Sequence, residues 1–239
     1  MIDFKIEEIA PLCAEFGVLL DEEKIKKLNL YGNLLIEWNE KINLTAITEP
    51  KAVLYKHFYD CILFLKHCKA EKGASLIDVG TGAGFPGMVL KIVRPDLEVT
   101  LLDSLNKRLV FLNEVIEKLE LIGIKTVHLR AEEAGKSKLH RESYDIATAR
   151  AVANLQVLLE YCTPLVKKGG SFVSMKGPTA NEEAAACGNA EKILGVKRTD
   201  IICETLTGEE QRTFILYKKI SQTPPKYPRK PNDISKQPL

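Results

Sequence analysis

The clearest chemical signal in the sequence is a glycine-rich turn, Asp78-Val-Gly-Thr-Gly-Ala-Gly84, at the end of an apolar segment typical of a buried strand. Glycines let the chain turn tightly and let a ligand approach its backbone, and a helix that begins there offers unpaired N–H groups. Asp103 lies 21 residues after Gly82, at the end of the next expected strand, where a carboxylate can accept hydrogen bonds from ribose hydroxyls. Together these features predict a site for a cofactor that contains adenosine.

The turn also bears on which cofactor binds. Gly82-Ala-Gly-Phe-Pro-Gly87 matches the dinucleotide fingerprint Gly-x-Gly-x-x-Gly, so NAD is one alternative. However, the carboxylate of Asp78 is unfavourable near a pyrophosphate and favourable near the ammonium of a methionine moiety. Phe85-Pro86 places bulk and a missing N–H where a diphosphate needs donors. S-adenosylmethionine, which has no phosphate, therefore fits the turn better.

Two further segments lie where expected strands end. Ala131 and Glu132 follow the third strand, where backbone groups can read an adenine, and Arg150 follows the fourth. Ligands of doubly wound folds bind at the carboxyl ends of the strands. Arg150 is therefore a candidate for a role in the site, with an ordinary surface charge as the alternative.

Several other chemistries have no support in the sequence. The six cysteines include no Cys-x-x-Cys pair, and the four histidines show no spacing typical of metal ligands, so we expect buried free thiols and no metal site. The longest run without charge, residues 79–90, is too short to span a bilayer. Charged residues within positions 3–8 stand where a signal peptide needs apolar ones. We therefore expect a cytoplasmic protein without membrane contact.

The periodicity of apolar residues changes along the chain. Residues 1–72 show helical spacing, with Asp21 and Thr48 as expected N-caps of the second and third helices. From residue 73, strands and helices alternate, which is typical of a doubly wound, mostly parallel α/β sheet. A short turn joins the last two strands, so we expect them to pair antiparallel, and we expect one helix over 181–194. The seven strands are expected at 75–79, 97–102, 125–129, 144–148, 171–175, 200–206 and 213–217.

The end of the chain differs in charge from the rest. From Lys218 onward six positive residues face one aspartate, so this proline-rich end is basic although the net charge of the chain is only +2. A basic end favours a polyanionic partner, and a solvated, disordered terminus is the alternative. We expect three parts: a helical extension packed on the core (1–72), an S-adenosylmethionine-dependent domain (73–221) and a basic tail (222–239).

Several long motifs stand in a fixed order along the chain. They are Trp38-Asn-Glu-Lys-Ile-Asn-Leu-Thr-Ala-Ile47, His57-Phe-Tyr-Asp60, Leu76-Ile-Asp-Val-Gly-Thr-Gly-Ala-Gly-Phe-Pro-Gly87, Leu102-Asp-Ser-Leu105, Arg130-Ala-Glu-Glu133, Ala149-Arg-Ala-Val152 and Tyr227-Pro-Arg-Lys-Pro231. With these motifs the chain resembles, over almost its whole length, the glucose-inhibited division protein B family, the bacterial small-subunit rRNA guanine-N7 methyltransferases. It departs from the family at Cys61, where a serine is usual, and at Asn232-Asp-Ile-Ser235, where glycine and another proline are usual.

The resemblance implies a Rossmann-like, seven-stranded class I methyltransferase fold, S-adenosylmethionine as cofactor, and 16S rRNA or the small ribosomal subunit as partner. It implies cofactor contacts at Gly80, Phe85, Asp103, Ser104, Leu105, Ala131, Glu132 and Arg150. Asp78, Gly82 and Gly84 of the turn complete the expected cofactor site. On the substrate side we expect RNA contacts, with structural or surface roles as the alternative, at Asn43, His57, Lys176, Lys226, Arg229 and Lys230.

The expected reaction is methyl transfer to guanine N7. This atom carries an in-plane lone pair and no proton at neutral pH, so no general base is needed, and the sequence shows no triad or carboxylate pair that would supply one. In A-form RNA the N7 atom lies in a deep groove that side chains cannot read. We therefore expect the target guanine in a loop or displaced from a helix.

Two other functions stay open at this point. One is an NAD-dependent oxidoreductase, and the other is a non-catalytic RNA-binding factor of ribosome assembly. The second leaves the glycine turn and Asp103 unexplained. The sequence carries no direct sign of oligomeric state, for which we take a monomer as the expectation.

Overall fold

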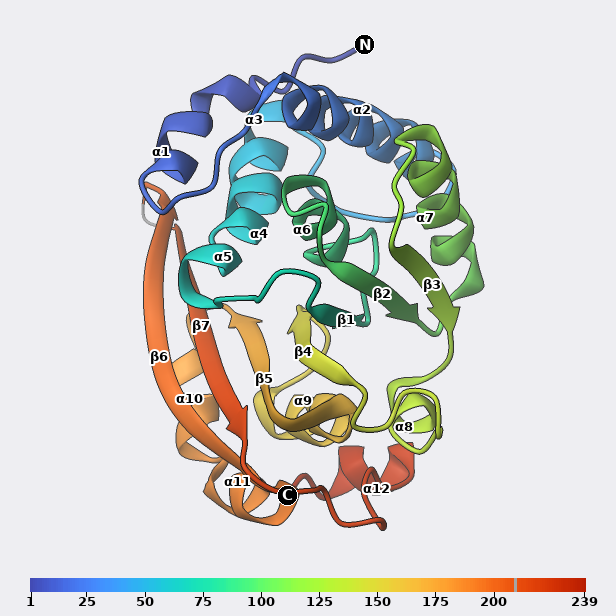
Figure 1. Cartoon of the computed structure of the whole chain (residues 1–239), viewed down its shortest axis with the longest axis vertical. Helices are drawn as coiled ribbons and strands as arrows, with labels where there is room; N and C mark the ends of the chain where they lie inside the picture. Colours follow the sequence, from blue (N-terminus) through green and yellow to red (C-terminus); the bar gives the residue numbers. More distant parts are fainter. Residues whose placement is uncertain (209) are drawn as a thin grey trace.

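A seven-stranded sheet forms the centre of the computed structural model, which describes residues 1–208 and 210–239 (Figure 1). The strand order is β3-β2-β1-β4-β5-β7-β6, with β1 to β5 parallel and β7 antiparallel to both β5 and β6. This confirms the predicted sheet with its reversed last strand. The strands are β1 (Ser75–Val79), β2 (Glu98–Asp103), β3 (Ile124–His128), β4 (Tyr144–Arg150), β5 (Val166–Lys176), β6 (Val196–Thr207) and β7 (Glu210–Lys219).

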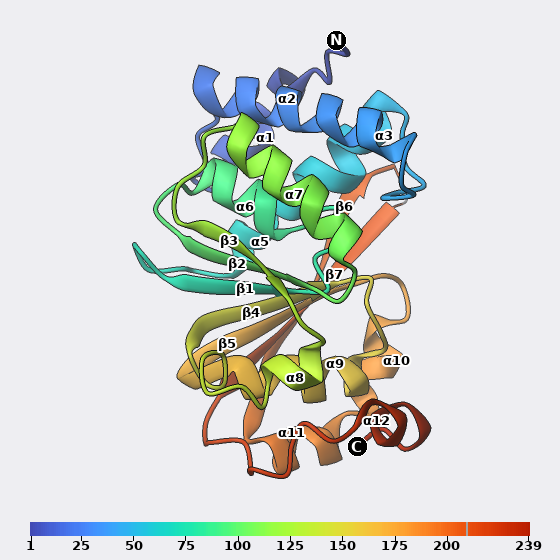
Figure 2. The same ribbon diagram turned by 90° about the vertical axis from the view of Figure 1, so that its right-hand side faces the viewer.

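Helices cover both faces of the sheet, α1 to α7 on one face and α8 to α12 on the other (Figure 2). A π-helical segment, η2 (Leu54–Tyr59), continues α3 into α4. The two 3₁₀ segments are η1 (Ile6–Glu8) and η3 (Thr163–Leu165). The α-helices are α1 (Ala10–Ala14), α2 (Glu22–Asn39), α3 (Pro50–Val53), α4 (Asp60–Ile62), α5 (Phe64–His67), α6 (Gly87–Val93), α7 (Asn106–Lys118), α8 (Ala131–Ala134), α9 (Leu155–Cys162), α10 (Ala180–Ala185), α11 (Gly188–Leu194) and α12 (Pro231–Lys236).

The helix starts confirm one predicted cap and correct another. The side chain of Asp21 accepts a hydrogen bond from the N–H of Lys24 at 2.9 Å and caps α2, as predicted. The cap of α3 is Glu49, one residue after the predicted Thr48, because the Glu49 carboxylate reaches the N–H groups of Lys51 and Ala52 at 3.0 and 2.7 Å. The single helix predicted over 181–194 is also wrong, since α10 ends at Ala185 and α11 begins at Gly188.

Two hydrophobic clusters lie on opposite faces of the sheet. Leu76 belongs to the cluster under α1 to α7, whereas its neighbour Ile77 belongs to the cluster above α9 to α11, because successive side chains of a strand point to opposite faces. Leu28 and Phe58 of the N-terminal helices are buried in the same cluster as Leu76. The N-terminal helices therefore share one hydrophobic core with the sheet.

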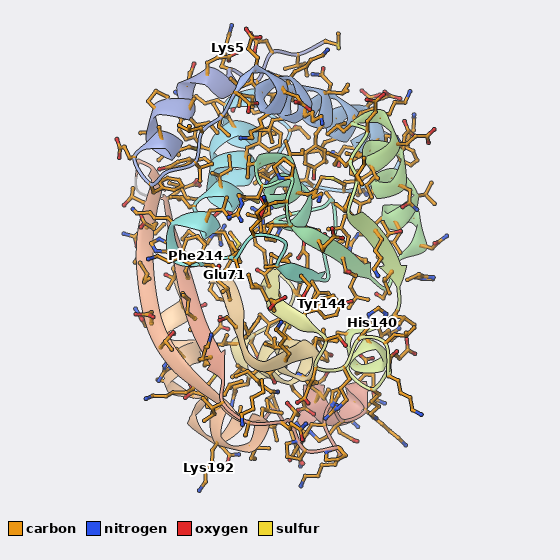
Figure 3. The ribbon with its side chains drawn as sticks, in the orientation of Figure 1. Lys5, Glu71, His140, Tyr144, Lys192 and Phe214 are labelled. Atoms are coloured by element: carbon orange, nitrogen blue, oxygen red, sulfur yellow. The ribbon has the colours of Figure 1, made fainter. Side chains whose placement is uncertain are left out.

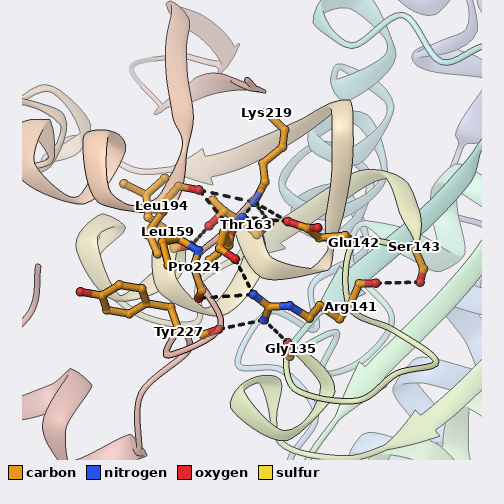
Figure 4. Close-up of polar contacts among 11 residues, drawn as sticks. Gly135, Arg141, Glu142, Ser143, Leu159, Thr163, Leu194, Lys219, Pro224 and Tyr227 are labelled. Atoms are coloured by element: carbon orange, nitrogen blue, oxygen red, sulfur yellow. Dashed lines mark hydrogen bonds and ion pairs between the residues drawn. The ribbon is translucent and has the colours of Figure 1, made fainter. Parts of the chain in front are cut away.

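The C-terminal segment packs on the lower face of the molecule and does not extend into solvent. The guanidinium of Arg141 donates to the carbonyls of Gly135, Thr223 and Tyr227 at 2.7 to 2.8 Å, and the buried ammonium of Lys219 donates to the Thr163 carbonyl at 2.8 Å (Figure 4). Tyr227 and Ile234 are themselves buried. The alternative of a solvated, disordered terminus is therefore wrong for this segment.

None of the helices among the described residues combines the length and the apolar character that a membrane span needs.

Candidate active site

Two adjoining cavities open at the carboxyl ends of the strands, where the strand order reverses between β1 and β4. The larger cavity has a volume of about 660 Å³ and the smaller cavity about 360 Å³. Gly80, Arg108 and Ala151 line both, so the two volumes meet beside the glycine turn. Ligands of open α/β sheets bind at this place in the fold.

The loop from β1 to α6 separates the cavities and is fixed from several sides. Gly80 and Gly84 have φ of 70° and 102°, and a Cβ on Gly80 would lie 2.7 Å from the Val152 side chain, so both positions require glycine. The N–H of Gly80 donates to the Leu102 carbonyl at 2.8 Å, and the buried hydroxyl of Tyr31 on α2 donates to the Ala83 carbonyl at 2.5 Å. The loop is therefore held in one shape by β2 and by the N-terminal helices.

Asp78 lies behind this loop and lines neither cavity. It is fully buried, and its Oδ2 accepts hydrogen bonds from the Thr81 hydroxyl at 2.6 Å and from the Gly87 N–H at 2.9 Å. Burial raises the pKa of this carboxyl group to about 6. In this structure Asp78 ties the two ends of the loop together through Oδ2, while its Oδ1 is buried and has no hydrogen-bond partner among the described residues. A contact of Asp78 with a ligand ammonium stays a prediction.

Asp103 lies in the smaller cavity at the end of β2, as predicted. Its carboxylate accepts from the N–H groups of Gly82 and Leu105, both at 2.9 Å, and pairs with Arg108 at 3.3 Å. The backbone therefore fixes the carboxylate at the rim of the glycine loop. The N–H of Leu105 serves this purpose, while its side chain is exposed and the residue lines neither cavity.

The opposite wall of the smaller cavity comes from α8 and its neighbours. Ser104, Ala131 and Glu132, which are predicted to contact the cofactor, line it, and so does Tyr161 of α9, which no sequence pattern indicates. The Oε1 atom of Glu132 is buried and has no hydrogen-bond partner among the described residues. A buried acceptor without a partner is costly unless a ligand supplies the donor.

Phe85, His57 and Arg150 form a stack at the inner end of the larger cavity. The rings of His57 and Phe85 are 4.3 Å apart and 20° from parallel, and the Arg150 guanidinium carbon lies 4.9 Å from the Phe85 centroid. The Nδ1 atom of His57 is 3.2 Å from Arg150 Nη2, and Nε2 is 2.9 Å from the Thr45 hydroxyl oxygen. Burial and the nearby Arg150 cation lower the pKa of His57 to about 3, so the imidazole is neutral at physiological pH.

A buried carboxylate, Asp60, connects Arg150 to β7. Arg150 Nη1 donates to Asp60 Oδ2 at 2.7 Å, while Arg212 donates to Oδ1 and Oδ2 at 2.7 and 3.0 Å. Asp60 is fully buried, and Arg212 lines the larger cavity. The sequence analysis did not select Asp60 or Arg212. The signal available for Asp60 was its place in the motif with His57, and no local pattern marks Arg212.

The predicted RNA-contacting residues do not come together. His57 lines the larger cavity, whereas Asn43 is exposed and lines neither cavity. Lys176 is bound to the Ala153 carbonyl at 2.8 Å and to Glu183 at 2.7 Å. The tail residues lie under α9, where Lys226 and Lys230 are exposed and Arg229 pairs with the buried Glu160 at 2.6 Å.

Another histidine contact lies away from the site. The Nδ1 atom of His140 is 2.7 Å from the hydroxyl of Tyr144, at the first residue of β4 (Figure 3). This is the end of the strand opposite the cavities, so the pair belongs to the base of the sheet. Among the described residues no group of His, Cys, Asp and Glu is arranged to hold a metal ion.

Solved structures of other proteins are similar to this chain in fold. Solved structures with the same fold include a mutant of MtNAS in complex with S-adenosylmethionine, with a TM-score of 0.55, 15% identity, and coverage of 90% of this chain and 78% of that one. A SAM-dependent methyltransferase from Aquifex aeolicus has a TM-score of 0.53 and 19% identity over 70% of this chain and 93% of that one. At these identities the likeness concerns the fold alone.

Curated sequences are much more similar. The Ribosomal RNA small subunit methyltransferase G of Clostridium perfringens (strain 13 / Type A) is 49% identical over 95% of each chain. The protein of the same name from Acetivibrio thermocellus is 54% identical over 94% of this chain and 92% of its own. The family model described as rRNA small subunit methyltransferase G matches residues 24–214. The chain therefore belongs to the rRNA small subunit methyltransferase G family.

Proposed function

We propose that the protein transfers the methyl group of S-adenosylmethionine to N7 of a guanine in small-subunit rRNA. The observation that carries this proposal is the continuity of the two cavities beside the glycine loop, with the Asp103 carboxylate in one and, among the described residues, no unpaired carboxylate in the other. Membership of a methyltransferase family favours this reaction over the oxidoreductase and over the non-catalytic assembly factor.

The smaller cavity fits the adenosine part of the cofactor. Asp103 is held by two backbone N–H groups and can accept hydrogen bonds from ribose hydroxyls. The unpartnered Oε1 of Glu132 can accept a hydrogen bond from an adenine amino group, which removes the cost of leaving it unsatisfied. Gly80 and Gly82 leave the backbone open for the methionine part where the cavities meet. When bound, the cofactor supplies an electrophilic methyl group.

The larger cavity fits an acceptor that needs alignment but no deprotonation. The lining includes the neutral His57 and several cations, and Glu210 is the single carboxylate among the described residues that line it. Glu210 lies at the mouth in an ion pair with Lys56. Guanine N7 already carries the lone pair that attacks, so the protein has to position the base and exclude water. Alignment of this kind can lower a barrier by about 7–11 kcal/mol.

The charge of the cavity rim suits a polyanion. Lys56 and Arg108 line the larger cavity beside Arg150, and cations of this kind bind RNA phosphates. Of the predicted tail contacts, Lys226 and Lys230 are exposed and free to reach phosphates, whereas Arg229 is engaged by Glu160. Because N7 is inaccessible in an A-form helix, the target guanine has to lie in a loop or be displaced from its helix.

The test is a methylation assay with mapping of the product. Small subunits, and separately their protein-free rRNA, are taken from cells that lack this enzyme and incubated with the purified protein and methyl-labelled S-adenosylmethionine. We expect label at one guanine, located by chain cleavage specific for N7-methylguanine. Label on another atom or base would contradict the proposal, and RNA binding without label would support the assembly factor instead.

A further inference from the structure

Two ion pairs connect the helical segment η2–α4 to the start of β7, and three of their four residues, Lys56, Glu210 and Arg212, line one wall of the larger cavity. Lys56 pairs with Glu210, and Asp60 pairs with Arg212. Glu210 and Arg212 are two residues apart in a strand, so their side chains lie on the same face. Lys56 and Asp60 are four residues apart along the helical segment, which places them on its facing side.

The two pairs differ in depth. The side chains of Asp60 and Arg212 are 0% and 18% exposed, whereas those of Lys56 and Glu210 are 36% and 45% exposed. Arg212 therefore lies toward the floor of the cavity, and Glu210 lies at the mouth. A flat ligand that lies along this wall would contact the Arg212 guanidinium at its inner end and the Glu210 carboxylate at its outer end.

Both side chains keep hydrogen-bonding capacity that the described residues do not use. Arg212 binds Asp60 through Nε and Nη2, and its Nη1 has no hydrogen bond to any described residue. Glu210 Oε1 accepts from Lys56, and Oε2 accepts from no described residue. The wall thus offers two N–H donors on Nη1 and, nearer the mouth, a charged acceptor.

This order of groups matches one edge of guanine. Starting at N7, that edge presents the O6 acceptor, then the N1–H donor, then the N2 amino donor. Adenine presents an amino donor at position 6 and an acceptor at N1, which is the reverse order. Resting on the proposed function, we propose that Arg212 donates to O6 while Glu210 accepts from N1–H and the N2 amino group, so that this wall selects guanine and leaves N7 free.

The expected size of the selection follows from its chemistry. Adenine would place its amino group against the guanidinium and its N1 lone pair against the carboxylate, leaving charged groups unpaired. Inosine keeps O6 and N1–H but lacks the N2 amino group, so it removes one hydrogen bond to Glu210 alone. A hydrogen bond to a charged group corresponds to about a ten- to hundredfold change in kcat/KM.

The test uses rRNA in which the mapped target guanine is replaced by inosine or adenine through ligation of a synthetic oligonucleotide. Methylation of the guanine and inosine RNAs is compared for wild type, Glu210→Ala and Lys56→Ala. We expect wild type to lose about tenfold in kcat/KM on inosine and more on adenine. In Glu210→Ala the inosine penalty should fall below about twofold because the acceptor is gone.

Lys56→Ala is the matched control, since it breaks the same ion pair but keeps the acceptor. The inosine penalty should persist in this variant. Loss of the penalty in Lys56→Ala as well would overturn the proposal, because the ion pair and not the base contact would then carry the selectivity. An unchanged penalty in Glu210→Ala would overturn it too.

Arg212→Lys tests the contact to O6. It should raise KM more for the guanine RNA than for the adenine RNA, so the preference for guanine over adenine should become smaller. Should this variant fail to fold, the Glu210 comparison decides alone. Binding of S-adenosylhomocysteine, measured by calorimetry, should be unchanged in Glu210→Ala, since that residue does not line the smaller cavity. A wild type that does not methylate N7 would refute the proposed function, whereas normal N7 methylation with unaltered base discrimination in Glu210→Ala refutes this inference alone.

Discussion

The two cavities are built in different ways. The smaller cavity is lined mainly by residues at the carboxyl ends of β1, β2 and β3 or directly after them, such as Val79, Asp103 and Ala131. The larger cavity is assembled from segments far apart in the chain, including residues 44–45, 56–57, 177–178 and 210–212. The cofactor side thus follows from the order of the strands, while the acceptor side depends on side chains brought together by tertiary packing.

The largest expected effect lies behind the larger cavity. Asp60→Ala removes the carboxylate to which both Arg150 and Arg212 are bound, and it leaves two largely buried guanidiniums without their anion. We expect the free energy of unfolding to fall by about 3–5 kcal/mol, measured by urea denaturation. The matched control is Asp96→Ala, which breaks an Asp–Arg pair at a more exposed site and should cost about 1 kcal/mol or less. Equal losses in the free energy of unfolding of the two variants would contradict the view that Asp60 stabilises the fold as a buried counter-ion of two arginines.

This contrast explains how much of the site the sequence could reveal. Asp103 was predictable because a strand end and a glycine turn fix its position locally. The Arg212–Asp60 contact joins residues 152 apart, and no local pattern reports such a pairing. The charge of Arg229 in the sequence predicts a phosphate contact, because the sequence does not show the buried Glu160 that binds this arginine. The fold followed from hydrophobic periodicity and connection lengths, whereas these long-range ion pairs depend on packing.

A second prediction concerns Asp78, which supports the loop between the cavities. Its pKa in the folded protein is raised by burial to about 6, above the unfolded value of about 3.9. The folded state therefore binds the proton more tightly, so this group's contribution to stability is present below about pH 4 and is lost as pH rises through about 6. Asp78→Asn keeps an oxygen for Thr81 and Gly87 and removes this slope.

The size of the effect follows from the shift. A change of about two pKa units corresponds to about 3 kcal/mol at most in the pH-dependent part of the free energy of unfolding. Unfolding in urea at several pH values between 4 and 7 measures it for wild type and variant. If the free energy of unfolding changed with pH in the same way for wild type and Asp78→Asn over this range, the titration could not be assigned to Asp78.

A third prediction separates the two cavities through ligand binding. Asp103→Asn should weaken binding of S-adenosylhomocysteine about ten- to hundredfold, because it removes the charge that accepts the ribose hydroxyls. It also leaves one oxygen for the N–H groups of Gly82 and Leu105, which bond to different oxygens of Asp103 in the wild type. Titration calorimetry measures this affinity. Selectivity between guanine and inosine RNA should stay as in wild type. If Asp103→Asn altered base selectivity but not cofactor affinity, the smaller cavity would bind the base and not the cofactor, which would contradict the assignment.

The smallest expected effect concerns the tail. It tests whether the RNA contacts the tail, on the side of the smaller cavity, or only the larger cavity. Lys226 and Lys230 are exposed, so replacing both with alanine should change the free energy of unfolding by about 0.5 kcal/mol or less. If both contact phosphates, the slope of log K for RNA binding against log salt concentration should decrease by about 1.4–1.8. Fluorescence anisotropy at several salt concentrations measures this slope, and we expect the decrease.

Arg229 has to be kept out of that comparison, because its guanidinium satisfies the fully buried Glu160 and supports the packing of the tail on α9. Arg229→Ala should cost stability as well as any RNA contact, so a weaker affinity in that variant would not identify a phosphate contact. The double lysine variant has no such ambiguity. An unchanged salt slope in it would assign the RNA to the larger cavity, where Lys56 and Arg108 supply positive charge, and would leave the tail with a structural role on the cofactor side.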